Sequence, residues 1–117
     1  MLEFTVERLD DKNLVMLRPA GELDAYTVAQ FREALAELAT EPRVVVELSD
    51  VPFMDSAGLG ALIGGIRRIR ENEGRVAVAC GRATLMRLLH TTGFNRIVPV
   101  KDTLEEAGDA LDQDPDT

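Results

Sequence analysis

Two short apolar runs, each followed by the pattern of a helix, constrain the fold of this chain more than any other feature. Residues 44–48 read Val-Val-Val-Glu-Leu and residues 75–80 read Arg-Val-Ala-Val-Ala-Cys. Runs that are apolar at almost every position are typical of strands buried on both faces of a parallel sheet. We therefore expect both segments at the centre of an α/β domain.

The first twenty residues have the pattern of a β-hairpin. Phe4 and Val6 alternate with polar residues, which is the period of a half-buried strand. The polar residues 10–13 form a short link to a second apolar strand at residues 14–17, so the two strands pair antiparallel. Residues 19–21, Pro-Ala-Gly, are expected to end the second strand.

The spacing of apolar residues predicts four helices. The first extends from about residue 26 to before Pro42, the second from Ser56 to Asn72 with Gly74 at its C-terminal cap, the third lies around residues 85–89 and the fourth around residues 104–111. A last strand is predicted at residues 96–100, where Pro99 favours a sheet edge or a strand end.

These elements predict a single α/β domain in the order β-β-α-β-α-β-α-β-α. The sheet is mixed and has four to five strands, and right-handed crossovers place the helices mainly on one face. A chain of 117 residues holds one such domain. We assign it to residues 1–112 and assign residues 113–117 to an acidic C-terminal tail.

Charge excludes several classes of function. The chain has 21 acidic and 13 basic residues and a net charge of −8, with seven of the acids in residues 101–117. This balance opposes binding to nucleic acid and docking on an anionic membrane. A lone cysteine, Cys80, forms no internal disulfide, and no run of 18 apolar residues occurs. We expect a cytoplasmic protein.

No catalytic constellation is visible, so we expect a protein that is not an enzyme and needs no cofactor or metal. His90 is the one imidazole, and nothing places a partner beside it. Ser56 does not lie in a G-x-S-x-G elbow, because residue 54 is Met. Cys80 ends an apolar strand and fits buried packing. Gly58 and Gly60 begin a dinucleotide fingerprint that lacks its third glycine.

The segment at residues 51–62 does suggest a function. We expect its loop to expose Phe53 and Met54 and the second helix to open at Asp55 and Ser56. Ser56 is a strong N-cap, and capping alone explains its presence. A hydroxyl at a helix N-terminus is also a place where backbone amides and the helix dipole stabilise a phosphate. Asp55 would repel that phosphate. The two negative charges of the phosphate would abolish docking of a partner.

A second candidate residue, Asp24, lies between the second strand and the first helix. Capping of that helix is one explanation of Asp24. The alternative is a shared site, because loops at the carboxyl ends of strands gather on one rim of such a sheet, which would bring Asp24 near Ser56.

The sequence resembles the STAS family, and the bacterial anti-sigma factor antagonists in particular. The resemblance is carried by Gly-Glu-Leu-Asp at residues 21–24, the strand at residues 44–48 and Phe-Met-Asp-Ser-Ala-Gly-Leu-Gly-Ala-Leu at residues 53–62. It implies that Ser56 is the phosphorylated serine and that Asp24 is the acidic residue near it. The partner-binding residues it implies are Asp24, Phe53, Met54, Asp55, Ser56, Gly58, Leu59 and Gly60.

The resemblance also implies a partner-switching mechanism. The unphosphorylated protein would bind an anti-sigma factor that is also a serine kinase, which releases the sigma factor. Phosphorylation of Ser56 would inactivate the antagonist, and a metal-dependent serine phosphatase would restore it. The alternative is that the chain is a STAS subunit of a lipid-transport complex or a signalling scaffold.

Overall fold

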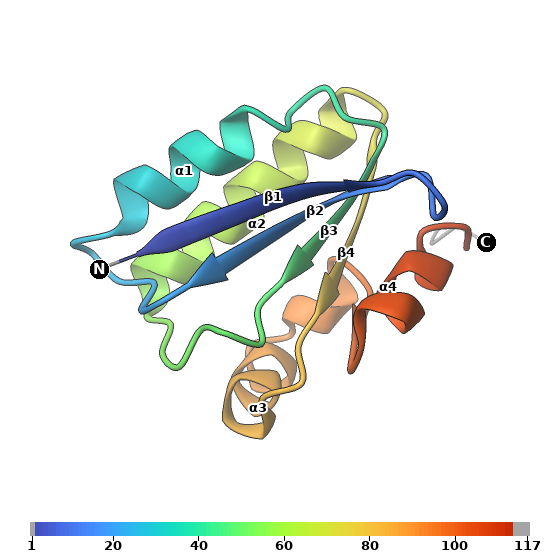
Figure 1. The fold of residues 1–117 in the computed structure, drawn as a ribbon. Coiled ribbons are helices and arrows are strands. Elements are labelled where there is room, and N and C mark those ends of the chain that lie inside the picture. Colours follow the sequence, from blue (N-terminus) through green and yellow to red (C-terminus); the bar gives the residue numbers. More distant parts are fainter. Residues whose placement is uncertain (1, 114–117) are drawn as a thin grey trace.

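A computed structural model describes residues 2–113 and shows a five-stranded sheet in the order β1-β2-β3-β4-β5 (Figure 1). β1 pairs antiparallel with β2, and the other neighbours pair parallel. The elements are β1 (Glu3–Leu9), β2 (Leu14–Ala20), α1 (Val28–Ala36), β3 (Arg43–Glu47), α2 (Ser56–Glu71), β4 (Arg75–Ala79), α3 (Ala83–Thr91), the 3-10 helix η1 (Phe94–Arg96), β5 (Val100–Lys101) and α4 (Leu104–Ala110). The predicted fold class and element order are confirmed.

The sheet is covered on both faces, as its apolar strands require. Alternate residues of the central strands pack on one face with α1, α2 and α3, around Phe31, Leu62 and Leu89. The other residues of those strands pack with α4 through Ala107 and Leu111. Three helices therefore share one face and the fourth covers part of the other. Residues 114–117 of the predicted tail lie outside the described residues.

The last strand is shorter than predicted. Residues 94–96 form η1, and pairing of β5 with β4 starts only at Val100. Pro99 lies where the next residue of the ladder would donate an N–H group to β4, and proline has none. The predicted last strand is present, but its predicted bounds of residues 96–100 were wrong.

The second strand continues further than predicted. β2 includes Pro19 and ends at Ala20. Pairing of β2 with β3 involves only residues 15–17. Pro19 is beyond them, so it does not interrupt that ladder.

The C-terminus of α2 also differs from the prediction at Gly74. The left-handed residue is Glu73, with φ 67°, rather than Gly74. Gly74 is needed for close approach instead, because a Cβ atom there would lie 2.6 Å from the carbonyl oxygen of Glu41 and from Ile69.

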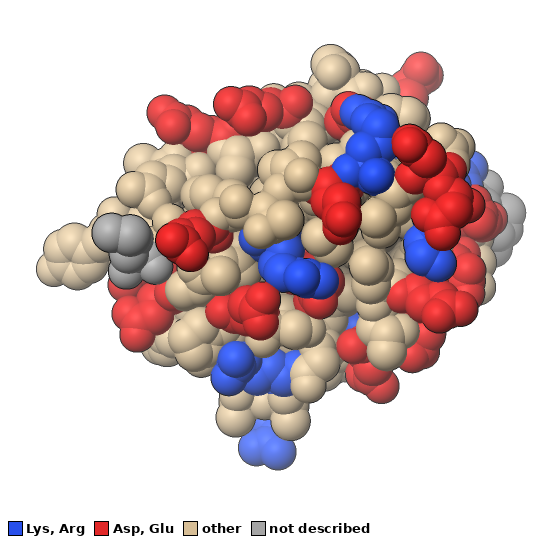
Figure 2. All heavy atoms as spheres, in the orientation of Figure 1, with Lys and Arg blue, Asp and Glu red and all other residues tan. Residues whose placement is uncertain are grey.

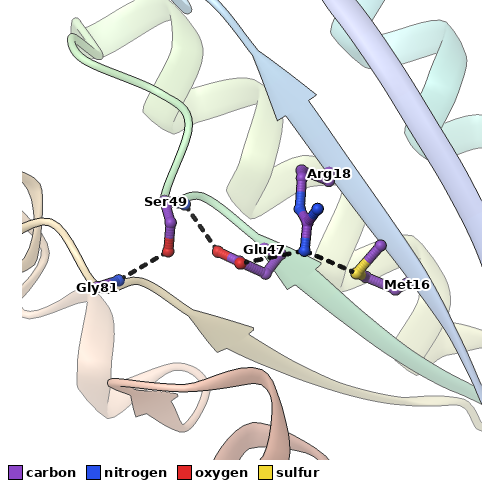
Figure 3. Close-up of polar contacts among 5 residues, drawn as sticks. All are labelled: Met16, Arg18, Glu47, Ser49 and Gly81. Atoms are coloured by element: carbon purple, nitrogen blue, oxygen red, sulfur yellow. Dashed lines mark hydrogen bonds and ion pairs between the residues drawn. The ribbon is translucent and has the colours of Figure 1, made fainter.

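A polar connection links three strands on the face that carries α4 (Figure 3). The buried carboxylate of Glu47 accepts a hydrogen bond from the Ser49 N–H at 2.7 Å and lies 3.6 Å from the Arg18 guanidinium. The Ser49 hydroxyl accepts a hydrogen bond from the Gly81 N–H at 2.9 Å. These contacts fix the direction in which the chain leaves β3 towards α2.

Adjacent glycines in α2 have different surroundings. A Cβ atom on Gly65 would lie 2.6 Å from the Leu35 side chain of α1, so glycine allows the two helices to approach closely. A Cβ atom on Gly64 would meet nothing within 4 Å.

We predict effects of opposite sign for these two glycines. Gly64→Ala should raise the free energy of unfolding by about 1 kcal/mol, because alanine restricts the unfolded chain and favours helix. Gly65→Ala should lower it by about 1–3 kcal/mol through overpacking against Leu35. Urea unfolding followed by circular dichroism measures both, and an equal response of the two variants would contradict the packing described.

Candidate functional site

The loops that follow β2 and β3 are joined by backbone hydrogen bonds beyond the ends of the strands. The Leu23 N–H donates to the Phe53 carbonyl at 3.0 Å, and the Asp55 N–H donates to the Leu23 carbonyl at 3.1 Å. Leu23 and Met54 thus form an isolated parallel bridge, and both side chains are buried. The loop that contains Asp24 therefore lies beside the loop that leads into Ser56, as predicted from the meeting of strand ends at one edge of the sheet.

Gly58 brings the first turn of α2 against this bridge. A Cβ atom at residue 58 would lie 2.5 Å from the Leu23 carbonyl oxygen and 2.9 Å from the Leu23 Cβ. The nearest obstacle is backbone, which cannot rotate away as a side chain can. Gly58 is one of the predicted partner-binding residues, but it is buried. Its role in the site is to let the helix approach the bridge.

Asp55, rather than Ser56, caps α2. The Asp55 carboxylate accepts hydrogen bonds from the N–H groups of Ala57 at 2.9 Å and Gly58 at 3.1 Å. Ser56 is the first residue of the helix and is exposed, and its hydroxyl forms no hydrogen bond within residues 2–113. The prediction that Ser56 is the cap was wrong, because Asp55 has the extended backbone of an N-cap residue and Ser56 is already helical. Two of the amides expected to stabilise a phosphate are therefore already occupied.

Asp24 organises the turn that leads into α1. Its Oδ1 atom accepts hydrogen bonds from the N–H groups of Tyr26 at 2.9 Å and Thr27 at 3.1 Å. The Thr27 hydroxyl in turn donates to the Glu22 carbonyl at 2.8 Å. Asp24 therefore orders the turn before α1 and does not cap the helix, whose N-cap is Thr27, so the capping explanation was wrong. Its half-buried carboxylate lies in the loop that is hydrogen-bonded to the segment before Ser56.

The two large side chains expected to be exposed behave differently. Phe53 is 51% exposed, whereas Met54 is only 4% exposed because it packs into the main core beneath the bridge. The expectation that the loop exposes Met54 was wrong. Tyr26, which the sequence analysis did not single out, is 95% exposed beside Asp24. Its place outside the apolar stripe of α1 was a signal that could have identified it.

The face of α2 that begins at Ser56 consists of small, exposed residues. Ser56, Gly60 and Gly64 are spaced by four residues and are all exposed, so they share one face of α2. Nothing lies within 4 Å of a Cβ atom built on Gly60. Leu59 is half-buried and packs on the main core. A partner can therefore approach the helix backbone closely along this face.

The described residues contain no group of three side chains arranged to hold a metal ion. The Cys80 thiol is buried at the end of β4, and burial raises its pKa, so the reactive thiolate is disfavoured. His90 is exposed near the C-terminus of α3, at a distance in the chain from both loops. Within residues 2–113, no helix is long and apolar enough to cross a membrane.

Both loops and α2 lie within a segment that matches a known domain family. Residues 5–107 match the STAS domain family. The chain belongs to this family. The match includes both loops, the bridge between them and all of α2.

The STAS relatives are regulators by name. The chain is 33% identical over 85 residues to the anti-sigma-B factor antagonist of Listeria monocytogenes, which covers 71% of this chain and 75% of the relative. An anti-sigma factor antagonist from Mycobacterium paratuberculosis has a similar crystal structure, with a TM-score of 0.86, 25% identity and coverage of 97% of this chain and 96% of that chain. The phosphorylated form of the Bacillus cell fate determinant SpoIIAA is also similar, with a TM-score of 0.66, 25% identity and coverage of 92% and 97%.

We predict that capping of the STAS domain's second helix depends on an acceptor at residue 55 and not on its charge. Asp55→Ala should lower the free energy of unfolding by about 1 kcal/mol, because two amide groups lose their acceptor. Asp55→Asn retains an oxygen acceptor and should change it by only a few tenths, about 0.3 kcal/mol. Thermal unfolding monitored by circular dichroism distinguishes the two, and equal destabilisation by both variants would show that charge dominates.

Proposed function

We propose that this STAS domain is an anti-sigma factor antagonist whose binding to an anti-sigma factor is controlled by phosphorylation of Ser56. The names of the relatives in Listeria monocytogenes and Mycobacterium paratuberculosis support the antagonist activity. The observation that carries the regulatory part is the position of Ser56, exposed and unbonded at the start of α2, beside the joined loops. A structurally similar protein has been solved in a phosphorylated form, which supports modification of this kind.

The proposed docking surface combines exposed aromatic groups with the open face of α2. Phe53 and Tyr26 provide large side chains of the kind that dominate binding energy at interfaces. Ser56 and Gly60 provide a surface without protruding side chains, on which a partner's backbone can lie. Asp24 and Asp55 accept backbone hydrogen bonds that order the loops of this surface, and Leu59 lies beside it. Met54 and Gly58 are buried beneath it.

Phosphate on Ser56 would act through charge. The modification adds about −2 charges at neutral pH. Asp55 caps the helix next to it, and Asp24 stands in the adjoining loop. Because the Ala57 and Gly58 amides already bind Asp55, the phosphate stays at the surface and repels acidic groups of the partner.

The remaining parts of the proposal concern the partners. The anti-sigma factor is proposed to be the serine kinase for Ser56, and a metal-dependent serine phosphatase to remove the phosphate. The antagonist itself is proposed to be a cytoplasmic binding protein with no catalytic activity or cofactor, and to contact neither nucleic acid nor membrane directly. Its buried thiol and exposed histidine are compatible with that assignment.

We predict that Ser56→Asp weakens binding to the anti-sigma factor by about 30-fold or more, because a fixed charge enters the interface. Ser56→Ala should bind within about twofold of the wild type, since the hydroxyl has no partner to lose within the described residues. Isothermal titration calorimetry with the anti-sigma factor encoded nearest to this protein's own gene measures both.

Thr84→Asp is the matched control, since Thr84 is an exposed residue in the first turn of α3. It should leave the affinity unchanged. Equal binding by wild type and Ser56→Asp would refute the phosphorylation switch. If a lipid-transport or scaffold protein were retained by all variants and no anti-sigma factor by any, the chain would instead serve as a STAS subunit.

Asp24→Asn tests the charge of the neighbouring loop separately from its structure. Asparagine can accept the same hydrogen bonds from Tyr26 and Thr27, so the stability should be unchanged. We predict a loss of about fivefold in either the rate of Ser56 phosphorylation or the affinity for the kinase. Radiolabelled phosphate transfer and calorimetry measure these two quantities, and wild-type values in both would remove Asp24 from the site.

A further inference from the structure

A second surface lies at the opposite end of α2 from Ser56. Two adjoining cavities of about 490 and 270 Å³ share Arg70 and Ile97 in their linings. Arg70 lies about 20 Å from Ser56 along the helix axis. We define the arginine groove as these two cavities together, with Arg67, Arg70, Arg75 and Arg96 around them.

The arginine groove is positive in a protein that is otherwise acidic. Its lining contains four guanidinium groups and only two carboxylates, those of Glu71 and Glu73, whereas the whole chain has a net charge of −8. Elsewhere, acidic side chains dominate, for example at the right of Figure 2, over the β1–β2 turn and α4. An acidic ligand is therefore repelled by most of the molecule and attracted to this groove.

Most guanidinium groups of the groove have no hydrogen-bond or ion-pair partner among the described residues. Among residues 2–113, the side chains of Arg67, Arg70 and Arg96 form neither a hydrogen bond nor an ion pair, although other arginines such as Arg8 and Arg43 pair with acids. Arg75 donates one hydrogen bond to the Leu111 carbonyl at 2.9 Å. The arginines of the groove therefore have donors available for carboxylates.

Backbone groups of β4 also face the groove. Val78 and Cys80 donate their N–H groups towards β5, to Pro99 and Lys101, whereas Arg75 donates towards β3. Because these directions alternate along a strand, the N–H and C=O groups of Val76 point to the β5 side. No hydrogen bond from the Val76 N–H to that side occurs within the described residues, and Pro99 has no N–H to offer the Val76 carbonyl.

We infer that the arginine groove binds an acidic segment of a partner protein in extended conformation. A peptide backbone supplies both an acceptor for the Val76 N–H and a donor for its carbonyl, in the arrangement of a neighbouring strand. Carboxylates of the segment pair with Arg70 and Arg96, and an apolar side chain covers Ile97, which is 37% exposed. This second docking site is separate from the surface around Ser56.

The test is fluorescence anisotropy of the full chain with a labelled hexapeptide of alternating glutamate and leucine. We expect the double variant Arg70→Glu, Arg96→Glu to lose affinity by about tenfold or more. Arg87→Glu, an exposed arginine of α3 outside both cavities, is the control and should change the affinity less than about twofold. Ser56→Asp should bind the peptide as the wild type does, so this result is independent of the phosphorylation switch.

Two further measurements keep the inference falsifiable if the double variant fails to fold. Arg70→Gln and Arg96→Gln should each weaken binding by about threefold. A hexapeptide N-methylated on alternate residues keeps its charges but loses backbone donors, and should bind about tenfold more weakly. The Val76 amide resonance of the wild type should shift when the unmodified peptide is added.

Three outcomes would overturn the inference. Wild-type affinity in the charge-reversed double variant would place the peptide elsewhere. Complete competition by millimolar inorganic phosphate, with no effect of N-methylation, would indicate a site for small anions. A concentration-dependent dimer in sedimentation that the double variant abolishes would show that the groove is filled by a second copy of the chain.

Discussion

The bridge between Leu23 and Met54 is the contact on which the candidate site depends. It extends the pairing of β2 and β3 past the ends of both strands, so two loops far apart in sequence share one set of backbone bonds. Gly58 then allows the first turn of α2 to rest on the Leu23 backbone. The positions of Asp24, Asp55 and Ser56 follow from this arrangement, because each is within two residues of a bridging or contacting residue.

The polar contacts of Glu47 fix the point at which the chain leaves β3 towards the bridge. A buried carboxylate is tolerated only when it is bonded, and here it contacts the Arg18 guanidinium and the Ser49 N–H. The Ser49 hydroxyl also accepts a hydrogen bond from the N–H of Gly81, which follows β4. The loop from β3 to α2, which carries the exposed Phe53, therefore starts where polar contacts link three strands.

The order of the elements was predictable because it depends on local patterns. Three elements can be recognised from their own residues: the apolar runs at residues 44–48 and 75–80 and the apolar stripe of α2. The structure confirms both strands and the helix. Two of the errors involve contacts between distant residues. Met54 is buried beneath the bridge that it forms with Leu23. β5 starts late because Pro99 has no N–H group to donate to β4. The cap depends on the backbone of Asp55, and a sequence containing Asp followed by Ser offers two acceptors without distinguishing them.

The Asp55 cap has a consequence for repeated use of the proposed switch. Since the end of α2 already has its acceptor, attaching or removing a phosphate at Ser56 neither completes nor breaks any internal bond of the helix. In the proposed switch, the two forms would keep the same backbone hydrogen bonds at the start of α2, so no refolding would separate them. The two forms would then differ only in surface charge, and the proposed kinase and phosphatase would set the timing of each cycle.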